Sequence, residues 1–362
     1  MKICIIGTRG VPNYYGGFEQ FAAYLSEMLV GRGHQVNVYN SHYHPYQQEE
    51  WKGVKIIHKY DPEEKIGTTG QFLYDLNCIL DARSRNFDII LQLGYTSSSI
   101  WGRFLPSKAK VVTNMDGLEW KRTKYSRLVQ QFLLYAEKLG VKFSDNLVSD
   151  SIGIQQYLKK KYGVNSTFIP YGSNCAESFS EEILKEYHVE ANKFSMLIAR
   201  LEPENSIEII LDGVEAANDT NLFLVVGNHE TKYGLYLKKK FANCRKIRFV
   251  GGLYDINKLN SLRFYAKVYF HGHTVGGTNP SLLEAMGSKA LICANDNVFN
   301  RSVLGDDALY FQNADDVKNI IEMEDVEERD SFVENNYRKI KELYSWERIV
   351  SQYEDLFLNV LS

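Results

Sequence analysis

The sequence predicts an α/β protein with two doubly wound parallel sheets that face each other across a cleft. Three observations favour this class. Apolar runs typical of buried strands alternate with helical patterns along most of the 362 residues. Two glycine-rich turns, around residues 7–19 and 271–284, each follow an expected strand and precede an expected helix. The length suits two domains of ordinary size, and a 44% apolar content is enough for their cores.

The first half begins with the run KICII at Lys2–Ile6, which is typical of a buried strand. An amphipathic helix is expected over 21–33, after the first glycine-rich turn. The other elements expected in this half are a helix over 72–83 and strands over 35–39, 54–58, 87–93 and 110–113. We expect the first domain to span residues 1–172.

The second half repeats this alternation, and we expect a second domain over 173–344. Its expected strands lie at 194–199, 222–226, 247–250, 268–270 and 290–293, and its expected helices over 206–214 and from Pro280. The last segment, 345–362, has apolar residues at helical spacing: Ile349, Tyr353, Leu356, Phe357 and Val360.

Bulk properties exclude several classes of protein. A net charge of −3 gives no general reason to expect nucleic acid as a partner. The five cysteines are scattered without a CxxC pair, so we expect reduced thiols and no zinc site. The N-terminal apolar run is four residues long before Gly7 and is interpreted as a strand, not a signal peptide. No apolar run is long enough to span a membrane.

The stretch HGHTVGGTNPSLLE, residues 271–284, is the main candidate for ligand binding. Its glycines allow close backbone approach, and Asn279 can cap a helix that opens with Pro280. Free N–H groups and the helix dipole favour a phosphate at such a place. Glu284 lies one turn inside this helix, where its carboxylate could accept hydrogen bonds from ribose hydroxyls. The alternative is an ordinary loop between strand and helix.

A second glycine-rich turn, GTRGVPNYYGGFE, follows the first strand. It differs from the G-x-G-x-x-G fingerprint, which disfavours a dinucleotide-dependent dehydrogenase. Gly16 and Gly17 at a helix start, with Glu19 in its first turn, suit a polar ligand. A tight connection without a ligand remains the alternative.

Two polar stretches follow strand ends, where ligands bind in parallel sheets. In NMDGLEWKR, Asp116 and Glu119 are candidates for acid–base chemistry or sugar binding; a helix cap and a solvated side chain are the alternatives. In ARLEPEN, Arg200 could bind a diphosphate bidentately, or form a surface ion pair with Glu202 or Glu204.

Residues 119–142 form a basic stretch with interleaved aromatics. Six basic and two acidic residues give it a positive charge within a chain of negative net charge. Trp120, Tyr125 and Phe132 within it suit a membrane surface. A core helix with a solvated basic face is the alternative. His273 has no companion that suggests a catalytic triad or a metal site; we interpret it as a polar residue of the cleft, or else as a packed loop histidine.

With these stretches side by side, the chain resembles the retaining nucleotide-sugar glycosyltransferases of family 4, which have the GT-B fold. It looks most similar to bacterial rhamnosyltransferases with a distinctive N-terminal domain. The motifs are IGTRGVPNYYGGFE, NMDGLEWKR, ARLEPEN and HTVGGTNPSLLEAM, and they span nearly the whole chain. The resemblance implies two Rossmann-like domains, an N-terminal acceptor domain and a C-terminal donor domain, with a terminal helix crossing back to the first.

The resemblance also implies roles for particular residues. Those implied to be catalytic are Asp116, Arg200 and Glu284. Those implied to bind the donor are Gly16, Gly17, Arg200, Asn205, Gly276, Gly277, Thr278, Asn279, Ser281, Leu282 and Glu284. Those implied to bind the acceptor are Glu19, Glu119, Lys121 and Arg122. Two positions depart from the family pattern: Gly276 replaces the first of two paired glutamates, and Asn205 replaces a lysine five residues after Arg200.

The resulting hypothesis is a retaining transferase that moves L-rhamnose from dTDP-L-rhamnose, or a sugar from a UDP-sugar, to a lipid-diphosphate-linked saccharide. It would act without a metal or other cofactor, since no DxD pair follows a strand. We expect a cytoplasmic enzyme bound to the inner face of the cell membrane, with no nucleic-acid partner. The alternatives are a non-catalytic nucleotide-sugar-binding partner of another transferase and a nucleotide-sugar epimerase.

Overall fold

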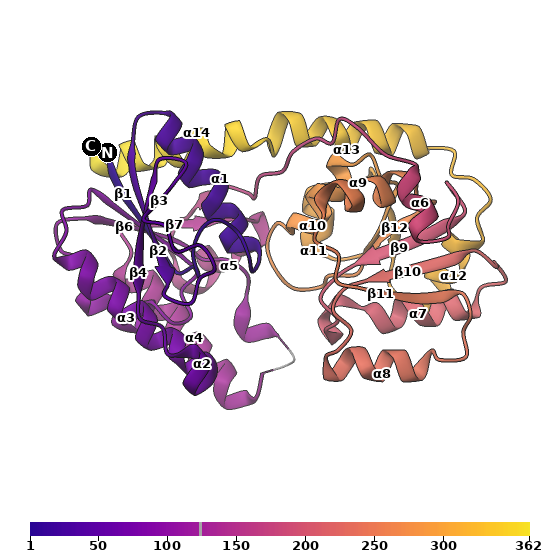
Figure 1. Cartoon of the computed structure of the whole chain (residues 1–362), viewed down its shortest axis with the longest axis horizontal. Helices are drawn as coiled ribbons and strands as arrows, with labels where there is room; N and C mark the ends of the chain where they lie inside the picture. Colours follow the sequence, from indigo (N-terminus) through magenta and orange to yellow (C-terminus); the bar gives the residue numbers. More distant parts are fainter. Residues whose placement is uncertain (123–124) are drawn as a thin grey trace. The chain divides into compact units, whose positions relative to one another are not determined.

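The computed structural model describes residues 1–122 and 125–362 (Figure 1). The chain divides into two compact units. Unit 1 contains residues 1–121, 125–171 and 346–362, and unit 2 contains Arg122 and residues 172–345. The end of the chain therefore belongs to the same unit as its beginning.

Unit 1 is built on an eight-stranded sheet. Its strands are β1 (Lys2–Ile6), β2 (Gln35–Ser41), β3 (Glu50–Trp51), β4 (Val54–Lys59), β5 (Ile89–Leu93), β6 (Lys110–Asn114), β7 (Asn146–Ser149) and β8 (Thr167–Phe168). The order is β3-β4-β2-β1-β5-β6-β7-β8, and β3 alone runs antiparallel to its neighbour. Because the order reverses between β1 and β5, the carboxyl ends of these two strands form the usual place for a ligand.

Helices cover both faces of this sheet, which explains why its central strands are continuously apolar. The helices are α1 (Gly17–Gly31), α2 (Glu63–Ile66), α3 (Gly70–Arg83), α4 (Arg127–Phe143), α5 (Ile152–Tyr162) and α14 (Trp346–Leu361). Figure 1 shows α3 and α4 on one side, and α1 with α14 on the other. The α1–α14 contact includes Tyr24 stacked on Trp346 at 4.5 Å and an ion pair of 2.7 Å between Arg32 and Glu354.

Unit 2 is built on a six-stranded, wholly parallel sheet. Its strands are β9 (Phe194–Ile198), β10 (Leu222–Val226), β11 (Ile247–Gly251), β12 (Tyr269–His271), β13 (Ile292–Asn295) and β14 (Leu309–Phe311). The order is β11-β10-β9-β12-β13-β14. Along the chain, β10 and β11 are added on one side of β9. The strands β12, β13 and β14 are then added on its other side, so the order reverses between β9 and β12.

The helices of unit 2 also lie on both faces of the sheet, as Figure 1 shows for α7 and α12 on one face and α9 and α10 on the other. The helices are α6 (Glu182–Glu186), α7 (Ile207–Ala216), α8 (Lys232–Lys240), α9 (Ile256–Tyr265), α10 (Pro280–Gly287), α11 (Val298–Leu304), α12 (Ala314–Glu322) and α13 (Arg329–Leu343). The core under α7 and α12 includes Ile210, Leu211, Phe223, Phe270 and Val317. The α/β class with doubly wound sheets is therefore confirmed.

Candidate functional site

Two adjacent strands of unit 2 deliver the predicted donor loops to one edge of the sheet. β9 pairs with β12 through Leu197 and Phe270, and the ARLEPEN and HTVGGTNP loops follow their carboxyl ends. The main-chain N and Oγ1 of Thr274 donate to the main-chain oxygen of Glu204, at 3.1 and 2.7 Å. A Cβ on Gly272 would lie 2.1 Å from the main-chain oxygen of Asn205, so only glycine permits this approach. The two loops form one structural element.

Arg200 is exposed at this edge, and no ion pair involving it is formed within residues 1–122 and 125–362. The alternative of a surface pair with Glu202 or Glu204 is therefore not supported, since the ion pair of Glu204 is with Arg122. Asn205 donates from Nδ2 to the main-chain oxygen of Arg200 at 2.7 Å. This bond fixes the backbone that presents the guanidinium.

Glu204 is a buried carboxylate that the sequence interpretation considered only as an ion-pair partner. Its side chain is 4% exposed, and neither carboxylate oxygen has a hydrogen-bond partner among residues 1–122 and 125–362. Nη1 of Arg122 lies 3.6 Å from Oε1 of Glu204. Burying a charge without hydrogen bonds is costly, so this group marks a place where function or position matters more than stability.

Two histidines stack beside this point. The rings of His271 and His273 lie 4.3 Å apart, and the side-chain amides of Asn297 and Asn300 both donate to the main-chain oxygen of His273. Burial, together with the smaller effects of the Arg200 and Arg122 charges, lowers the pKa of His273 to about 3. Burial likewise lowers the pKa of His271. Both imidazoles are thus neutral at physiological pH, and His273 Nδ1 is buried without a hydrogen-bond partner.

The first turn of α10 follows the predicted form. The side chain of Asn279 accepts a hydrogen bond from the Ser281 N–H at 2.9 Å, and Pro280 occupies the first helical position. Gly276 has a φ of +133°, and a Cβ there would meet nothing within 4 Å. This positive φ favours glycine at position 276. The missing side chain also leaves open space beside the backbone.

Two predicted donor residues in this turn point inward. Leu282 is fully buried in the core, so only its backbone could face a ligand. The hydroxyl of Ser281 lies 2.7 Å from the hydroxyl of Tyr269. Thr278 is buried, and Gly277 is half-buried. A side-chain role in the donor site is thus not indicated for Leu282 and Ser281, because packing directs both side chains into the unit.

Glu284 is held by an arginine that the sequence interpretation missed. Nη2 of Arg263 donates to Oε2 of Glu284 at 2.7 Å, and the Arg263 side chain is 1% exposed. A buried arginine with such a bond fixes the orientation of the carboxylate. No signal in the sequence pairs these residues, because Arg263 lies on α9 and reads as an ordinary charged helix residue.

In unit 1, Glu19 bonds to the glycine-rich loop. Its Oε1 accepts from Thr8 Oγ1 at 3.2 Å and from the main-chain N of Arg9 at 3.0 Å, and the side chain is buried. The Gly17 main-chain oxygen accepts from the Tyr171 hydroxyl, and the Gly16 N–H donates to Asn13 Oδ1 at 3.2 Å. The carboxylate predicted to bind acceptor therefore also stabilises the loop.

Asp116 lies two residues beyond β6 in an unusual backbone conformation. Its φ is +48°, which is uncommon for a residue other than glycine, and such strain is frequent at functional sites. Its N–H donates to Asn114 Oδ1 at 2.9 Å, and Asn114 Nδ2 donates to the Tyr353 hydroxyl. The following 3₁₀ turn spans Glu119–Lys121, so Asp116 does not cap a helix.

The predicted acceptor residues separate between the units. Glu119 and Lys121 lie in unit 1, and the Lys121 ammonium lies 5.6 Å from the centre of the Trp120 ring. Arg122 belongs to unit 2 through its contact with Glu204.

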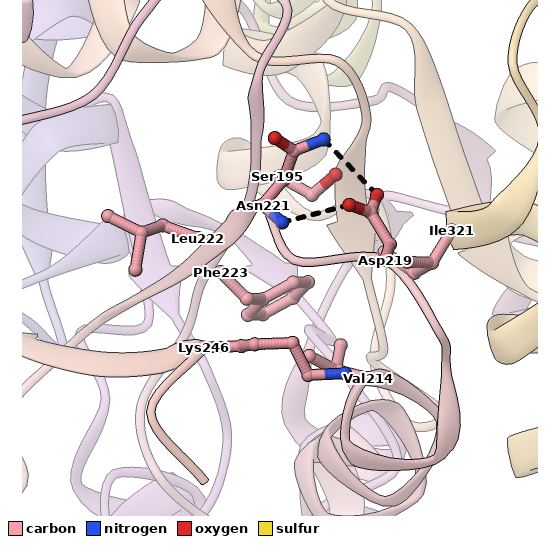
Figure 2. Close-up of a pocket in the computed structure, with 8 residues that line it drawn as sticks. All are labelled: Ser195, Val214, Asp219, Asn221, Leu222, Phe223, Lys246 and Ile321. Carbon is pink, nitrogen blue, oxygen red and sulfur yellow. Dashed lines mark hydrogen bonds between the residues drawn. The ribbon is translucent and has the colours of Figure 1, made fainter.

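Figure 2 shows a small hollow at the opposite, amino edge of the unit 2 sheet. Its lining residues are Ser195, Val214, Asp219, Asn221, Leu222, Phe223, Lys246 and Ile321. Asn221 donates to Asp219 through N at 2.8 Å and Nδ2 at 3.3 Å, and Lys246 donates to the Ala217 oxygen. These polar groups satisfy one another, and parallel sheets bind ligands at their carboxyl ends, so this hollow is not the candidate site.

Among residues 1–122 and 125–362, no cluster of three or more histidine, cysteine or carboxylate side chains could hold a metal ion. None of the helices described there combines the length and apolar character needed to cross a bilayer.

Comparisons with known proteins agree with this architecture. Residues 1–174 match the family model of a domain of unknown function, DUF1972. The fold resembles sucrose-phosphate synthase from Thermosynechococcus elongatus, with a TM-score of 0.81, 17% identity, and coverage of 99% of this chain and 98% of that chain. It also resembles Anabaena HepE in complex with UDP and glucose, with a TM-score of 0.76, 16% identity, and coverage of 99% and 100%.

A third similar structure is WaaG, a glycosyltransferase involved in lipopolysaccharide biosynthesis, with a TM-score of 0.71 and 13% identity. Each chain covers 99% of the other. No curated protein sequence matches the chain. At these identities the similarity establishes the fold, and the chain has the GT-B fold of these solved structures.

Proposed function

We propose that the protein is a retaining glycosyltransferase that uses a nucleotide-sugar donor. The observation that supports this most is the exposed guanidinium of Arg200, which forms no ion pair with the part of the chain that the structure describes. It lies beside a glycine-rich loop and a helix start, at the reversal point of the unit 2 sheet. An arginine and backbone N–H groups there suit the diphosphate of a nucleotide sugar. The resemblance in fold to HepE, solved with UDP and glucose, supports the same class of donor.

In this proposal each residue has a separate task. Arg200 binds the diphosphate, and Glu284, oriented by Arg263, accepts hydrogen bonds from ribose hydroxyls. The backbone of Gly16 and Gly17 binds the donor phosphates or the acceptor, and Asp116 orients the sugar or the acceptor. The leaving diphosphate takes the proton of the acceptor hydroxyl as the acceptor attacks from the same face, which retains the anomeric configuration. Positive charge beside that oxygen stabilises the transition state.

We propose L-rhamnose, from dTDP-L-rhamnose, as the sugar. Gly276 supports this choice, because the space beside it is open. The resembling transferases have a glutamate at this position, and its carboxylate contacts hydroxyls of the donor hexose. A 6-deoxy sugar presents a methyl group there, and an unpaired carboxylate would cost about 1–3 kcal/mol. The acceptor in this proposal is a lipid-diphosphate-linked saccharide of a bacterial cell-surface polysaccharide.

We also propose that the protein binds the inner face of the cell membrane through α4. The solvent side of this helix is apolar at helical spacing: Leu128 is 79% exposed, and Tyr135 is 57% exposed, with Phe132 between them. The exposed basic residues Arg127 and Lys138 flank this stripe. An apolar stripe flanked by basic residues suits an anionic lipid surface. Lys124 of the same basic stretch lies outside the described residues.

The test is incubation of the protein with dTDP-rhamnose, UDP-glucose and UDP-GlcNAc, with and without synthetic lipid-diphosphate saccharides. We expect transfer of rhamnose that requires the lipid-linked acceptor, with the donor configuration retained in the product. Binding of a nucleotide sugar without transfer to any acceptor would favour the non-catalytic partner. Interconversion of free nucleotide sugars would favour an epimerase.

A further inference from the structure

Four exposed tyrosines gather at the carboxyl edge of the unit 1 sheet, and none of them is among the residues predicted to bind the acceptor. Strands β4, β2 and β1 are consecutive neighbours in that sheet and run parallel, so the loops that follow them lie side by side. These loops contribute Tyr14, Tyr15, Tyr43 and Tyr60, which are between 39% and 58% exposed. Aromatic rings bury a large area when they bind a partner, so a group of them left exposed on such loops requires an explanation.

The first two tyrosines pack on a buried histidine. The ring of His44 lies 5.4 Å from the ring of Tyr14, in edge-to-face geometry, and 5.9 Å from the ring of Tyr15. His44 Nε2 donates to the main-chain oxygen of Pro12 at 3.0 Å, which joins the loop after β2 to the loop after β1. Asn13 Oδ1 accepts a hydrogen bond from the Tyr15 N–H at 3.0 Å. Both rings are therefore positioned at the surface by fixed neighbours.

The other two tyrosines are joined by a second histidine. The ring of His42 lies 3.8 Å from the ring of Tyr43 and 5.0 Å from the ring of Tyr60. His42 Nδ1 accepts a hydrogen bond from the Asp61 N–H at 3.0 Å, which joins the loop after β2 to the loop after β4. Because side chains packed in this way lose little conformational freedom when a ligand binds, the arrangement favours binding.

The guanidinium beside these rings is already neutralised. Arg9 lies 5.5 Å from the centre of the Tyr15 ring, and it donates to both carboxylate oxygens of Glu63 at 2.8 to 3.2 Å. Apart from histidines, two basic and four acidic residues occur in the three loop segments, which are residues 7–16, 42–49 and 60–66. Such a surface does not suit a phosphate, a diphosphate or an anionic membrane, so we expect an uncharged ligand.

We propose that these four tyrosines bind the sugar rings of the acceptor saccharide; this inference rests on the proposed function. A pyranose has faces of C–H groups, which pack on the negative face of an aromatic ring, and hydroxyls around its edge. The phenol hydroxyl of a tyrosine can donate to such a hydroxyl or accept from it. The loop of Tyr14 and Tyr15 continues into Gly16 and Gly17, whose backbone is proposed to bind the donor phosphates or the acceptor. Rings that start at this loop and continue to Tyr60 suit several linked sugars.

The test is binding of the full-length protein to an array of synthetic bacterial oligosaccharides, followed by calorimetric titration with the glycan that binds most tightly. The first variant is Tyr14→Ala with Tyr60→Ala, which removes one ring from each histidine group. The second is Tyr14→Phe with Tyr60→Phe, which keeps both rings and removes their hydroxyls. Tyr236→Ala is the control, at a half-exposed tyrosine of α8 in unit 2. Because all three side chains are exposed, the variants should fold as wild type does.

We expect wild type to bind at least one glycan. Tyr14→Ala with Tyr60→Ala should weaken that binding about tenfold to a hundredfold, and the phenylalanine variant should lose less, because its rings remain. Tyr236→Ala should bind the glycan as wild type does. The affinity for dTDP, measured by the same calorimetry, should be equal in all four proteins.

Three results would overturn the inference. Binding of no glycan by wild type, or equal glycan affinity in the alanine variant, would show that the tyrosines do not bind the saccharide. Equal losses in the alanine and phenylalanine variants would contradict packing of sugars on the rings. A wild-type dimer that the alanine variant dissociates would indicate a contact between two copies of the chain instead. In each case, dTDP binding by wild type leaves the proposed function in place. Glycan binding without any binding of dTDP or UDP would reject the proposed function and not the tyrosine site.

Discussion

At the scale of single residues, Arg200 and Glu284 show two ways of presenting a charge. Arg200 extends from a loop whose backbone is fixed by Asn205, and its guanidinium faces solvent. Glu284 is fixed at its own carboxylate by the buried Arg263. The exposed charge is available to a ligand at little desolvation cost, whereas the fixed carboxylate contributes orientation.

Arg200→Gln should lower kcat/KM for the donor by about tenfold to a hundredfold, because a hydrogen bond to a charged group contributes about 1.5–3 kcal/mol. Steady-state transfer with varied nucleotide sugar measures this. Arg245→Gln is the matched control. A kcat/KM for Arg200→Gln equal to that of wild type would remove Arg200 from the donor site.

The contact of Arg122 with Glu204 predicts a pattern in stability. Arg122→Gln removes the guanidinium that pairs with the buried Glu204 carboxylate and should lower the free energy of unfolding by about 1–3 kcal/mol. Adding Glu204→Gln removes the buried charge and should restore most of that loss. Urea unfolding followed by far-UV circular dichroism measures the cycle. Additive losses in the double variant would show that the two groups are not coupled.

Asp75 on α3 predicts a pH dependence in unit 1. Burial raises the pKa of Asp75 to about 7, against the hydrogen bond that its carboxylate accepts from Ser97 Oγ at 2.5 Å. The folded value lies above the ordinary value of 3.8, so the folded chain binds more protons between about pH 4 and 7. The free energy of unfolding therefore decreases through this window as pH rises.

Asp75→Asn should remove this dependence. Its stability gain over wild type should grow from near zero at pH 4 to at most about 4 kcal/mol at pH 8. Tryptophan fluorescence during urea unfolding reports on unit 1 selectively, because Trp51, Trp101, Trp120 and Trp346 all belong to it. Asp306→Asn, at a fully exposed carboxylate, is the control. A gain that is independent of pH would contradict the raised pKa.

At the scale of elements, apolar runs predicted the strands well because both faces of these sheets are covered. KICII and LFLVV became β1 and β10 with the expected bounds. The bounds of β13 moved by two residues, since Ala290 and Leu291 are buried but unpaired in a strand that runs from Ile292 to Asn295. Short strands such as β8, with two residues, have too few side chains to show a pattern in the sequence.

The site residues could be predicted only where the residue types within a single loop indicate ligand binding. Glycines, a helix cap and an arginine after a strand identify the loops beside β9 and β12. Arg263, His271 and Glu204 were not identified as site residues, because their importance comes from contacts between residues far apart in the sequence. The inward direction of Ser281 and Leu282 was not predictable either, since it depends on the rotation of α10 against its neighbours.

The exposed face of α4 allows a test of membrane binding. Arg127→Gln with Lys138→Gln should weaken binding to phosphatidylglycerol vesicles about thirtyfold, at about 1 kcal/mol for each basic residue. Leu128→Ser with Tyr135→Ser should weaken it by a similar amount through lost apolar contact. Vesicle co-sedimentation at low and high salt measures both effects. Leu358→Ser, at a half-exposed leucine of α14, is the control. Equal pelleting of all variants would reject this surface.

At the scale of the whole molecule, both units follow one topological rule. Each sheet adds strands first on one side of its opening strand and then on the other, so each has a reversal point at its carboxyl edge. The candidate residues follow the loops at these points: Gly16 and Gly17 after β1 in unit 1, Arg200 and Gly276 after β9 and β12 in unit 2. The sequence predicts this plan from its alternating elements, but it does not reveal that Arg122 belongs to unit 2.

The central claim is that a nucleoside diphosphate binds at the carboxyl edge of the unit 2 sheet. Amide hydrogen exchange of the full-length protein, with and without saturating dTDP, tests it most directly. If dTDP binds there, residues 199–206 and 272–284 should exchange more slowly, with no change around the amino-edge hollow at 219–223. Protection centred on that hollow, or no protection in either loop while dTDP is bound, would contradict the account.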